Sequence, residues 1–507
     1  MILRYTASAD NTIVNAFKTN LSKRATGSNA GLADVLETYS IYGRQAVSTS
    51  AGPASQELSR ILVQFPITDI SRDRTAGTLP ASGKVNFYLR LFNAPHSKTV
   101  PRDYKLVVYP ISQSWQEGEG LDLEGYKDET KGNPGSNWVS ASDSAGWTRP
   151  GGDYLTSNSS LIYEQTFEGG TEDLEIQITP LVESWIAGTT QNYGVGVFLS
   201  SSFEAYFSGS GGADSGSVLN NLNGAQKSYF TKRFFARGTQ YYFKKPIIEA
   251  RWNSSRKDQR NEFYFSSSIA PGADNLNTIY LYNYVRGRLT NLPGVGTGEL
   301  LVSLYSGSAD NTEPSGSKLT LYNSKNHATG GYVATGIYSC SIGIVSSSTS
   351  PLYDVWHKNG TEYFTGSIIP KVFRSSETEP HEDYIITLTN LQNTYRANQL
   401  ERFNLFVRPR NWNPTIYTKA VATVPSTVIQ SASYRVIRSI DNLEVIPYGT
   451  GSDNHTILSC DENGNYYDFR MSLLEPGYEY KFKFSFYNDR MNTWQEQQEE
   501  FKFRVDK

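Results

Sequence analysis

One long acidic loop carries the residue types that a glycoside hydrolase uses. This loop, residues 112–154, places Trp115 beside a run of carboxylates, which are Glu117, Glu119, Asp122 and Glu124. Two carboxylates beside an aromatic ring can act as acid and base when they lie about 5 Å or about 6.5–9.5 Å apart. The same residues are typical of a loop that solvates itself while Trp115 packs beneath it. We favour the packed loop, and keep sugar or cation binding and catalysis as alternatives.

Sugar binding would need aromatic faces, and the same loop supplies them. Its candidate stacking residues are Trp115, Trp138, Trp147 and Tyr154. Together with Glu117 they form the candidate ligand site of this part of the chain. A cell-surface glycan is the alternative partner that this set predicts.

Other catalytic patterns are missing from the sequence. The five histidines, none of them in an H-E-x-x-H or H-x-H arrangement, are His96, His327, His357, His381 and His455. The cluster of His381, Glu382 and Asp383 abuts a polar segment, and adjacent strand residues point to opposite faces. We therefore expect a solvent-exposed segment at the start of a domain there, and no metal or acid–base site. The chain has no G-x-S-x-G or Walker A motif, and residues 294–298 resemble a hairpin turn.

Metal and thiol chemistry are equally weakly indicated. Cys340 and Cys460 lie far apart, so we expect two free thiols and no cysteine zinc site. Asp10 and Asn11 could offer oxygen ligands to Ca²⁺, but no D-x-D-x-D-G loop accompanies them. We therefore predict no catalytic residue, no metal, no cofactor and no enzymatic activity.

An aromatic–basic run at residues 229–245 includes Arg233 and Arg237 as candidate binding residues, and a shorter run follows at 402–412. Interleaved tyrosine and arginine are enriched at protein–protein interfaces. The same alternation describes an ordinary sandwich strand with one buried face and one face of extended cationic side chains. Both interpretations stay open.

The composition indicates an all-β protein. The 507 residues include 34 Tyr but only 3 Met, with 42 Gly and 21 Pro for turns. The 47 Lys and Arg balance 50 Asp and Glu, which gives a net charge of −3, so no basic excess exists to neutralise a phosphate backbone and we expect no nucleic-acid partner. No stretch approaches 18 apolar residues, so we expect no membrane insertion. The first ten residues become polar after three, and we expect no secretion signal.

Short strands separated by turn residues continue along the chain and predict three tandem β-sandwiches. We expect a jelly-roll domain at 1–243 and two sandwiches of the immunoglobulin or fibronectin kind at 244–374 and 375–507. Single strands are expected at 241–248, 261–266 and 331–344, among many others. One short helix is expected at 179–188, with Thr179 as its N-cap and Gly188 after its last turn.

Several blocks of the N-terminal half resemble the DNRLRE-type β-sandwich domain, a module related to carbohydrate-binding modules of bacterial surface and secreted proteins. The blocks are residues 7–12, 58–65, 111–118, 147–153 and 176–199. The C-terminal half is similar, more loosely, to β-sandwich regions of tailed-bacteriophage virion proteins, at residues 403–409 and 473–478.

These resemblances imply a rigid, adhesin-like module, which is normally exported. Because no secretion signal is expected, we predict a protein that assembles in the host cytoplasm and leaves by lysis. The prediction is a non-enzymatic virion component, a neck, tail, baseplate or capsid-decorating protein. Its partners would be other virion proteins and copies of itself. A carbohydrate-binding adhesion protein is the alternative.

Overall fold

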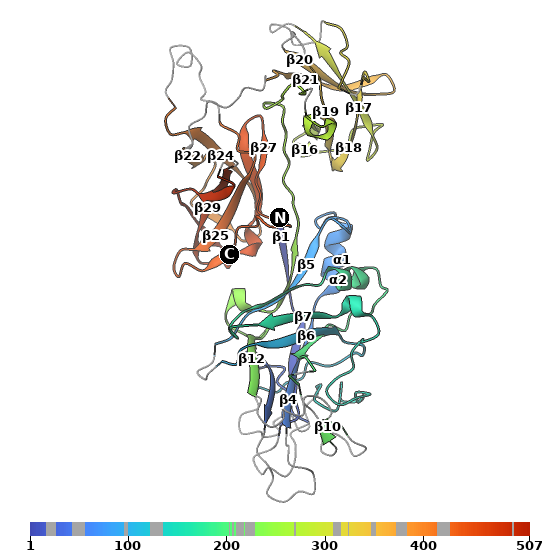
Figure 1. Ribbon diagram of the computed structural model, residues 1–507, viewed down its shortest axis with the longest axis vertical. Coiled ribbons are helices and arrows are strands. Elements are labelled where there is room, and N and C mark those ends of the chain that lie inside the picture. Colours follow the sequence, from blue (N-terminus) through green and yellow to red (C-terminus); the bar gives the residue numbers. More distant parts are fainter. Residues whose placement is uncertain are drawn as a thin grey trace, which may run out of the picture. The chain divides into compact units, whose positions relative to one another are not determined.

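The chain forms an all-β structure, as the composition predicts (Figure 1). The computed structural model describes residues 1–16, 27–42, 56–95, 100–121, 135–201, 203–204, 207–208, 217–218, 229–267, 270–307, 316–322, 324–345, 351–371, 383–412, 426–488 and 491–507. It contains two compact units, Met1–Asn253 (unit 1) and Ser254–Lys507 (unit 2). Each unit is described by itself below.

Unit 1 is a β-sandwich of two antiparallel sheets. The four-stranded sheet has the order β1 (Ile2–Thr6), β13 (Ile247–Arg251), β5 (Asn86–Leu91) and β8 (Leu174–Gln177). The seven-stranded sheet has the order β12 (Tyr229–Phe235), β3 (Val35–Tyr42), β4 (Gln56–Gln64), β9 (Val195–Leu199), β6 (Tyr104–Pro110) and β7 (Tyr163–Phe167), with β2 (Ala9–Val14) paired to β4. Two short strands, β10 (Phe207–Ser208) and β11 (Ser217–Val218), form a separate pair.

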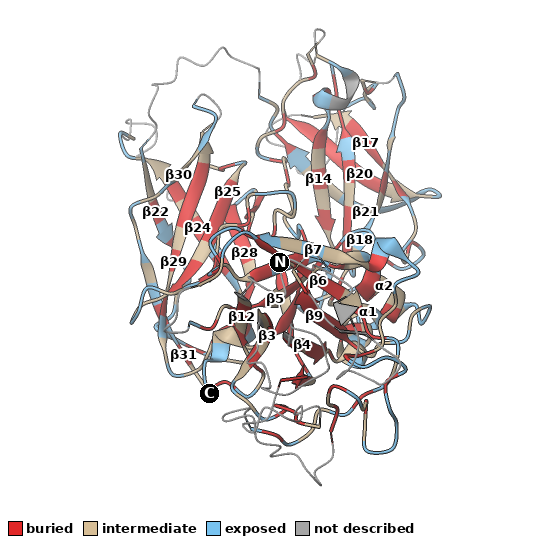
Figure 2. Ribbon diagram, turned by 60° about the horizontal axis from the view of Figure 1, so that its bottom comes forward, coloured by how far each residue is buried: buried red, intermediate tan, exposed pale blue. Residues whose placement is uncertain are grey.

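The core of unit 1 follows from strand alternation. In β5 every second residue, Phe87, Leu89 and Leu91, is buried between the sheets. In β4 both faces are buried: Ile61 enters the sandwich core and Leu62 enters a second cluster on the other face. Figure 2 shows these central strands as largely buried. Burial on both faces explains the uninterrupted apolar run Ile61-Leu62-Val63 within this strand.

Two helices, α1 (Ile67–Thr75) and α2 (Thr179–Ile186), pack on unit 1 and are tied by an ion pair of 2.7 Å between Arg74 and Glu183. The predicted helix is confirmed, with Gly188 in the left-handed region at φ +71°. The N-cap prediction is wrong, because Ile178 holds that position. The Thr179 hydroxyl instead accepts a hydrogen bond from the backbone N–H of Phe87. Short 3₁₀ turns lie at Ser159–Leu161 and Tyr242–Lys244.

Unit 2 begins with a six-stranded antiparallel sheet around a core that includes Phe263, Tyr338 and Trp356. Its order is β14 (Asn277–Tyr282), β19 (Ile337–Ile342), β18 (Ala328–Ala334), β17 (Leu300–Ser306), β20 (Leu352–Lys358) and β21 (Thr361–Ile368). A small hairpin joins β15 (Tyr284–Val285) to β16 (Arg288–Leu289), and a 3₁₀ turn covers Gly272–Asn275.

The C-terminal part of unit 2 is a second sandwich. One sheet has the order β22 (Tyr384–Leu388), β24 (Leu400–Pro409), β28 (Gly464–Arg470) and β27 (Ser459–Asp461). The other has the order β23 (Thr394–Arg396), β31 (Phe501–Asp506), β29 (Glu479–Asn488), β25 (Ala432–Arg438) and β26 (Glu444–Ile446), with β30 (Thr493–Glu496) paired to β29. A 3₁₀ turn lies at Met471–Leu473. Stacked and edge-on rings fill the centre, among them Phe403, Tyr467 and Phe482.

Three local predictions differ from the structure. Residues 242–244 form a 3₁₀ turn, and the following strand β13 pairs inside unit 1, so this unit extends past the expected boundary at 243. Within 261–266 the described backbone makes only an isolated bridge, at Tyr264. The expected strand at 331–344 is a hairpin of β18 and β19, which turns at Gly336 with φ +70°. Residues 375–380, where the third expected domain begins, lie outside the described residues.

Candidate functional site

The tryptophans of the 112–154 loop pack beneath it on the outer face of the seven-stranded sheet. Trp115, Trp138 and Trp147 are all buried against Ile13 and Leu62. The indole N–H of Trp115 donates to the carbonyl of Tyr193, and that of Trp147 to the carbonyl of Asn137, each at 2.8 Å. These rings therefore present no exposed face on which a sugar could stack, and the packed-loop interpretation agrees with their burial.

Arg60 of β4 holds this loop to the sheet. Its guanidinium forms a two-point pair with the carboxylate of Glu204, at 2.7 Å for both contacts, and donates to the carbonyl of Gly151 at 2.9 Å. The same group lies 4.4 Å from the ring centroid of Phe198 and 5.6 Å from that of Tyr154. Tyr154, a predicted binding residue, thus belongs to an internal cage, where burial raises the pKa of its hydroxyl to about 12.

Glu117 and Arg237, two predicted binding residues 120 positions apart, form a two-point ion pair. Both Glu117 oxygens lie 2.8 Å from Nη2 of Arg237, and Oε1 also accepts from the backbone N–H of Asp10 at 2.9 Å. The backbone N–H of Arg237 in turn donates to the Asp10 carboxylate. The cationic guanidinium therefore fills the place beside Glu117 that a sugar or a cation would need.

The neighbouring polar side chains are equally occupied. The amide of Asn11 accepts from the backbone N–H of Ala30 at 2.9 Å and donates to Ser136. The oxygens proposed as calcium ligands at Asp10 and Asn11 thus accept backbone hydrogen bonds. Among the described residues, no group of three or more His, Cys, Asp or Glu side chains is arranged to hold a metal ion.

Asp10→Asn should stabilise unit 1, and increasingly so as pH rises. Burial raises the pKa of Asp10 to about 7, against 3.8 for an ordinary aspartate, so the folded chain holds a proton that the unfolded chain releases. Stability contributed by the protonated form is lost between about pH 4 and pH 7. We expect Asp10→Asn to raise the free energy of unfolding at pH 8 by about 2–4 kcal/mol, and by little at pH 4.

The measurement is thermal unfolding of the full chain across that pH range. Asp69→Asn, at an exposed position on α1, is the control and should not reproduce the gain in stability at pH 8. An equal effect of Asp10→Asn at pH 4 and pH 8 would contradict the assignment.

Arg233 and the rest of the aromatic–basic run divide into two parts. In β12 the run is an ordinary strand: Phe234 is buried, and Arg233 pairs across to Glu37 of β3 at 3.1 Å. After the strand, Tyr241 and Tyr242 are 54% and 44% exposed. The strand interpretation thus describes residues 229–235, and the interface interpretation stays a prediction for the exposed tyrosines that follow.

Several candidate residues cannot be placed. Asp122, Glu124, His96, His381 and Glu382 lie outside the described residues. Glu119 is exposed in the loop.

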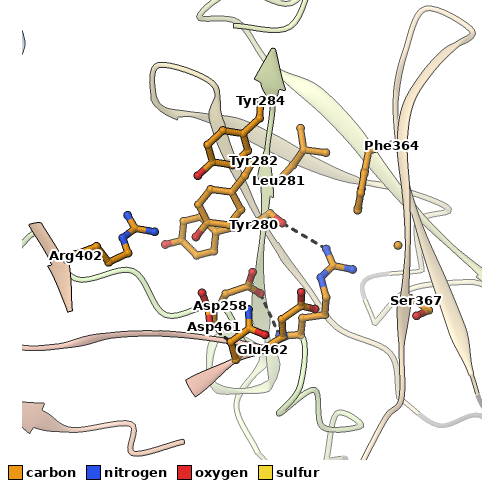
Figure 3. Close-up of a pocket in the computed structure, with 13 residues that line it drawn as sticks. Asp258, Tyr280, Leu281, Tyr282, Tyr284, Phe364, Ser367, Arg402, Asp461 and Glu462 are labelled. Atoms are coloured by element: carbon orange, nitrogen blue, oxygen red, sulfur yellow. Dashed lines mark hydrogen bonds between the residues drawn. The ribbon is translucent and has the colours of Figure 1, made fainter. Parts of the chain in front are cut away.

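Unit 2 contains a cavity that the sequence did not predict. It has a volume of about 460 Å³ and is lined by aromatic, acidic and basic side chains (Figure 3). Its aromatic residues are Tyr280, Tyr282, Tyr284 and Phe364, and its charged residues are Asp258, Arg260, Arg402, Asp461 and Glu462. Figure 3 shows the three tyrosines one above another, as expected for alternate residues of an extended chain.

Backbone pairing brings the acidic residues of the cavity together. The segment before β14 runs parallel to β27: Asp258 N–H donates to the carbonyl of Cys460, and Cys460 N–H donates to the carbonyl of Arg256, each at 2.9 Å. The Asn261 side chain donates to the carbonyl of Glu462. Asp258 therefore lies beside Asp461 and Glu462 although about two hundred residues separate them.

The two arginines of the cavity are neutralised by carboxylates that do not line it. Arg260 forms a buried two-point pair with Asp354, which also accepts from the indole N–H of Trp356 at 2.7 Å. Arg402 pairs with Asp468 at 2.8 Å. The carboxylates of Asp258, Asp461 and Glu462 thus leave the cavity with a negative balance.

Burial also affects the acids themselves. It raises the pKa of Asp258 to about 6, although Arg260 opposes the shift, and it raises the pKa of Asp461. The sequence did contain a signal for this site, namely three tyrosines at alternate positions 280, 282 and 284. What it lacked was the position of the acids opposite them.

No helix among the described residues is both long and apolar enough to cross a membrane.

Comparison with known proteins identifies no family. No protein-family model matches the chain, and no curated protein matches it. Among solved structures, the N-terminal Ig1-2 module of the Drosophila receptor protein tyrosine phosphatase DLAR is similar at 9% identity, with 48% of this chain and 95% of that chain covered and a TM-score of 0.15. The adhesin InvE of Yersinia pseudotuberculosis gives 9% identity, 45% and 54% coverage, and a TM-score of 0.14.

Alpha-2-macroglobulin of E. coli is matched at 7% identity over 97% of this chain and 28% of that chain, with a TM-score of 0.15. Such scores carry no argument about function. The resemblance to DNRLRE-type domains and to bacteriophage proteins stays a prediction.

Proposed function

We propose that the chain is a non-enzymatic structural component of a tailed-bacteriophage virion, which docks onto other virion proteins and onto copies of itself through sandwich faces and loops. The observation that carries the proposal is the exposed pair of Tyr241 and Tyr242. These rings lie between β12 and β13, two strands of a rigid sandwich.

The tyrosine pair has the properties of a contact surface. Tyr241 packs edge-on against Phe235 at 5.3 Å, and Tyr242 packs edge-on against Phe243 at 5.1 Å, so neighbouring rings support both side chains. Lys244 adds a cation beside Phe92. Exposed aromatic residues held in place lose little conformational entropy on binding and are enriched at the energetic centres of interfaces.

The internal use of the loop residues supports a structural role. Glu117 is paired with Arg237, and Trp115, Trp138 and Trp147 are buried. These groups fix the long loop to the sheet. The glycan-binding alternative would need the same rings to be exposed, so the geometry favours protein docking.

The test is quantitative mass spectrometry of purified particles of the phage that encodes the chain. We expect a fixed copy number per particle that matches a symmetry of the virion. Presence in the lysate with absence from purified particles would overturn the proposed function.

A variant series then tests the surface itself. In a phage lacking the gene and supplied with variants, Tyr241→Ala combined with Tyr242→Ala should reduce incorporation into particles at least tenfold. Tyr332→Ala, at another exposed tyrosine, is the control and should incorporate normally. Equal incorporation of both variants would show that the tyrosine pair is not a docking surface.

A further inference from the structure

We propose that the cavity of unit 2 binds an arginine side chain of a protein partner. This inference rests on the proposed function, because it assigns the chemistry of one docking contact. The cavity is the one lined by Asp258, Tyr282 and Phe364 in Figure 3.

Charge is the first argument. Each arginine of the lining already has its own carboxylate, Asp354 for Arg260 and Asp468 for Arg402. The lining thus holds three carboxylates and two guanidinium groups, and each of these two groups already has a carboxylate partner outside the lining. An incoming cation would meet a negative field, strengthened by the low dielectric of a partly enclosed site.

The position of Asp258 is the second argument. This residue is 8% exposed, and its carboxylate lines the cavity. Its Oδ1 accepts from the backbone N–H of Arg260 at 3.1 Å, while Oδ2 has no hydrogen-bond partner among the described residues. A deeply set carboxylate oxygen that faces the cavity is suited to accept a hydrogen bond from a ligand.

The aromatic lining decides which cation fits. Tyr280 and Tyr282 lie with ring centroids 6.1 Å apart and nearly parallel, and the exposed rings of Tyr284 and Phe364 also line the cavity. A planar guanidinium stacks on aromatic faces and can also form two parallel hydrogen bonds to a carboxylate. A lysine ammonium group can pair with a carboxylate, but it has no planar face to stack on a ring and no pair of parallel donors.

The lining residues and the volume of the cavity both argue against a bare metal ion as the ligand. A divalent cation takes several oxygen ligands at about 2.0–2.6 Å, and no group of three or more His, Cys, Asp or Glu side chains among the described residues is arranged to hold one. A cavity of about 460 Å³ has the volume of an organic ligand site and accommodates a side chain with part of its backbone.

The experiment uses the full chain and saturation-transfer NMR with three probes. The probes are acetyl-Gly-Arg-Gly-amide, its lysine analogue, and its citrulline analogue, which has nearly the shape of arginine without the charge. We expect saturation to reach the arginine side chain, at least threefold weaker transfer to lysine, and none to citrulline. Equal transfer to arginine and citrulline would overturn the proposal.

Variants locate the binding site. Asp258→Asn should weaken arginine binding at least tenfold, and Glu462→Gln, at an exposed position, should weaken it several-fold. Glu164→Gln, an exposed acid of unit 1, is the control and should bind as the native chain does. Unchanged binding in both cavity variants would also overturn the proposal.

A pH series adds an independent readout. Asp258 titrates with a pKa of about 6 while facing Arg260, Asp461 and Asp354, so binding should weaken as pH falls from 7 to 5. Binding that is constant over this range would contradict the role of Asp258. Arginine binding by a chain that is absent from particles would keep this inference and remove the virion function, whereas incorporation without arginine binding would do the reverse.

Discussion

Glu249→Ala should destabilise unit 1 by about 3–5 kcal/mol, because it leaves three arginines on one sheet face without their shared partner. Glu249 lies on β13 and is 2% exposed. Its carboxylate lies 2.7 Å from Nε of Arg4, 2.6 Å from Nε of Arg251 and 3.4 Å from Nη1 of Arg90. Without it, Glu175 would be the remaining carboxylate beside Arg90 and Arg251.

The loss should depend on pH in a defined direction. Burial alone would raise the pKa of Glu249, but the three guanidinium groups hold it below the ordinary 4.5. The stabilisation is therefore complete above about pH 4.5 and is lost as pH falls below that value. The difference between the native chain and Glu249→Ala should be largest near pH 7 and should shrink towards pH 3.

Hydrogen–deuterium exchange of β1 and β13 in the full chain measures this effect locally. Glu164→Ala removes one member of an exposed pair with Lys105 and should change stability by less than about 1 kcal/mol. If the amides of β1 and β13 are equally protected from exchange in Glu249→Ala and Glu164→Ala, Glu249 does not stabilise the three arginines.

Asp354→Asn should destabilise the six-stranded sheet of unit 2 by about 3–5 kcal/mol, since it removes the charge that compensates a buried arginine. Asp354 is fully buried, and its carboxylate accepts from Arg260 and from the indole of Trp356. Asparagine has nearly the same volume, so the loss would report charge and hydrogen bonding rather than a cavity.

Urea unfolding followed by exchange in β20 measures the change. Asp468→Asn breaks the more exposed pair with Arg402 and should cost less than about 1 kcal/mol. The same Asp354→Asn variant should also weaken arginine binding, because the released charge of Arg260 would offset the acids of the cavity. A variant as stable as the native chain would show that the pair contributes nothing.

Local structure was accessible from sequence because its signals are local. The all-β class was predicted correctly, because short apolar strands such as β9 (Val195–Leu199), whose residues are all buried, are limited by turn residues. The helix expected at 179–188 is present, with Gly188 after its last turn. Strand β13 was assigned to the wrong domain, because its partners β1 and β5 lie far away in sequence.

Sequence alone determined the fold class. Alternating apolar residues and frequent turn residues allow the apolar side chains to be buried on the faces of short strands, which is the pattern of an all-β protein. It also identified Glu117 and Arg237 as candidate binding residues. Only the tertiary structure decided that these two neutralise each other, that the loop tryptophans face inward, and that Asp258 lies beside Glu462. The physical reason is that charge compensation and burial depend on which distant segments pair, and strand pairing is not encoded in any one segment.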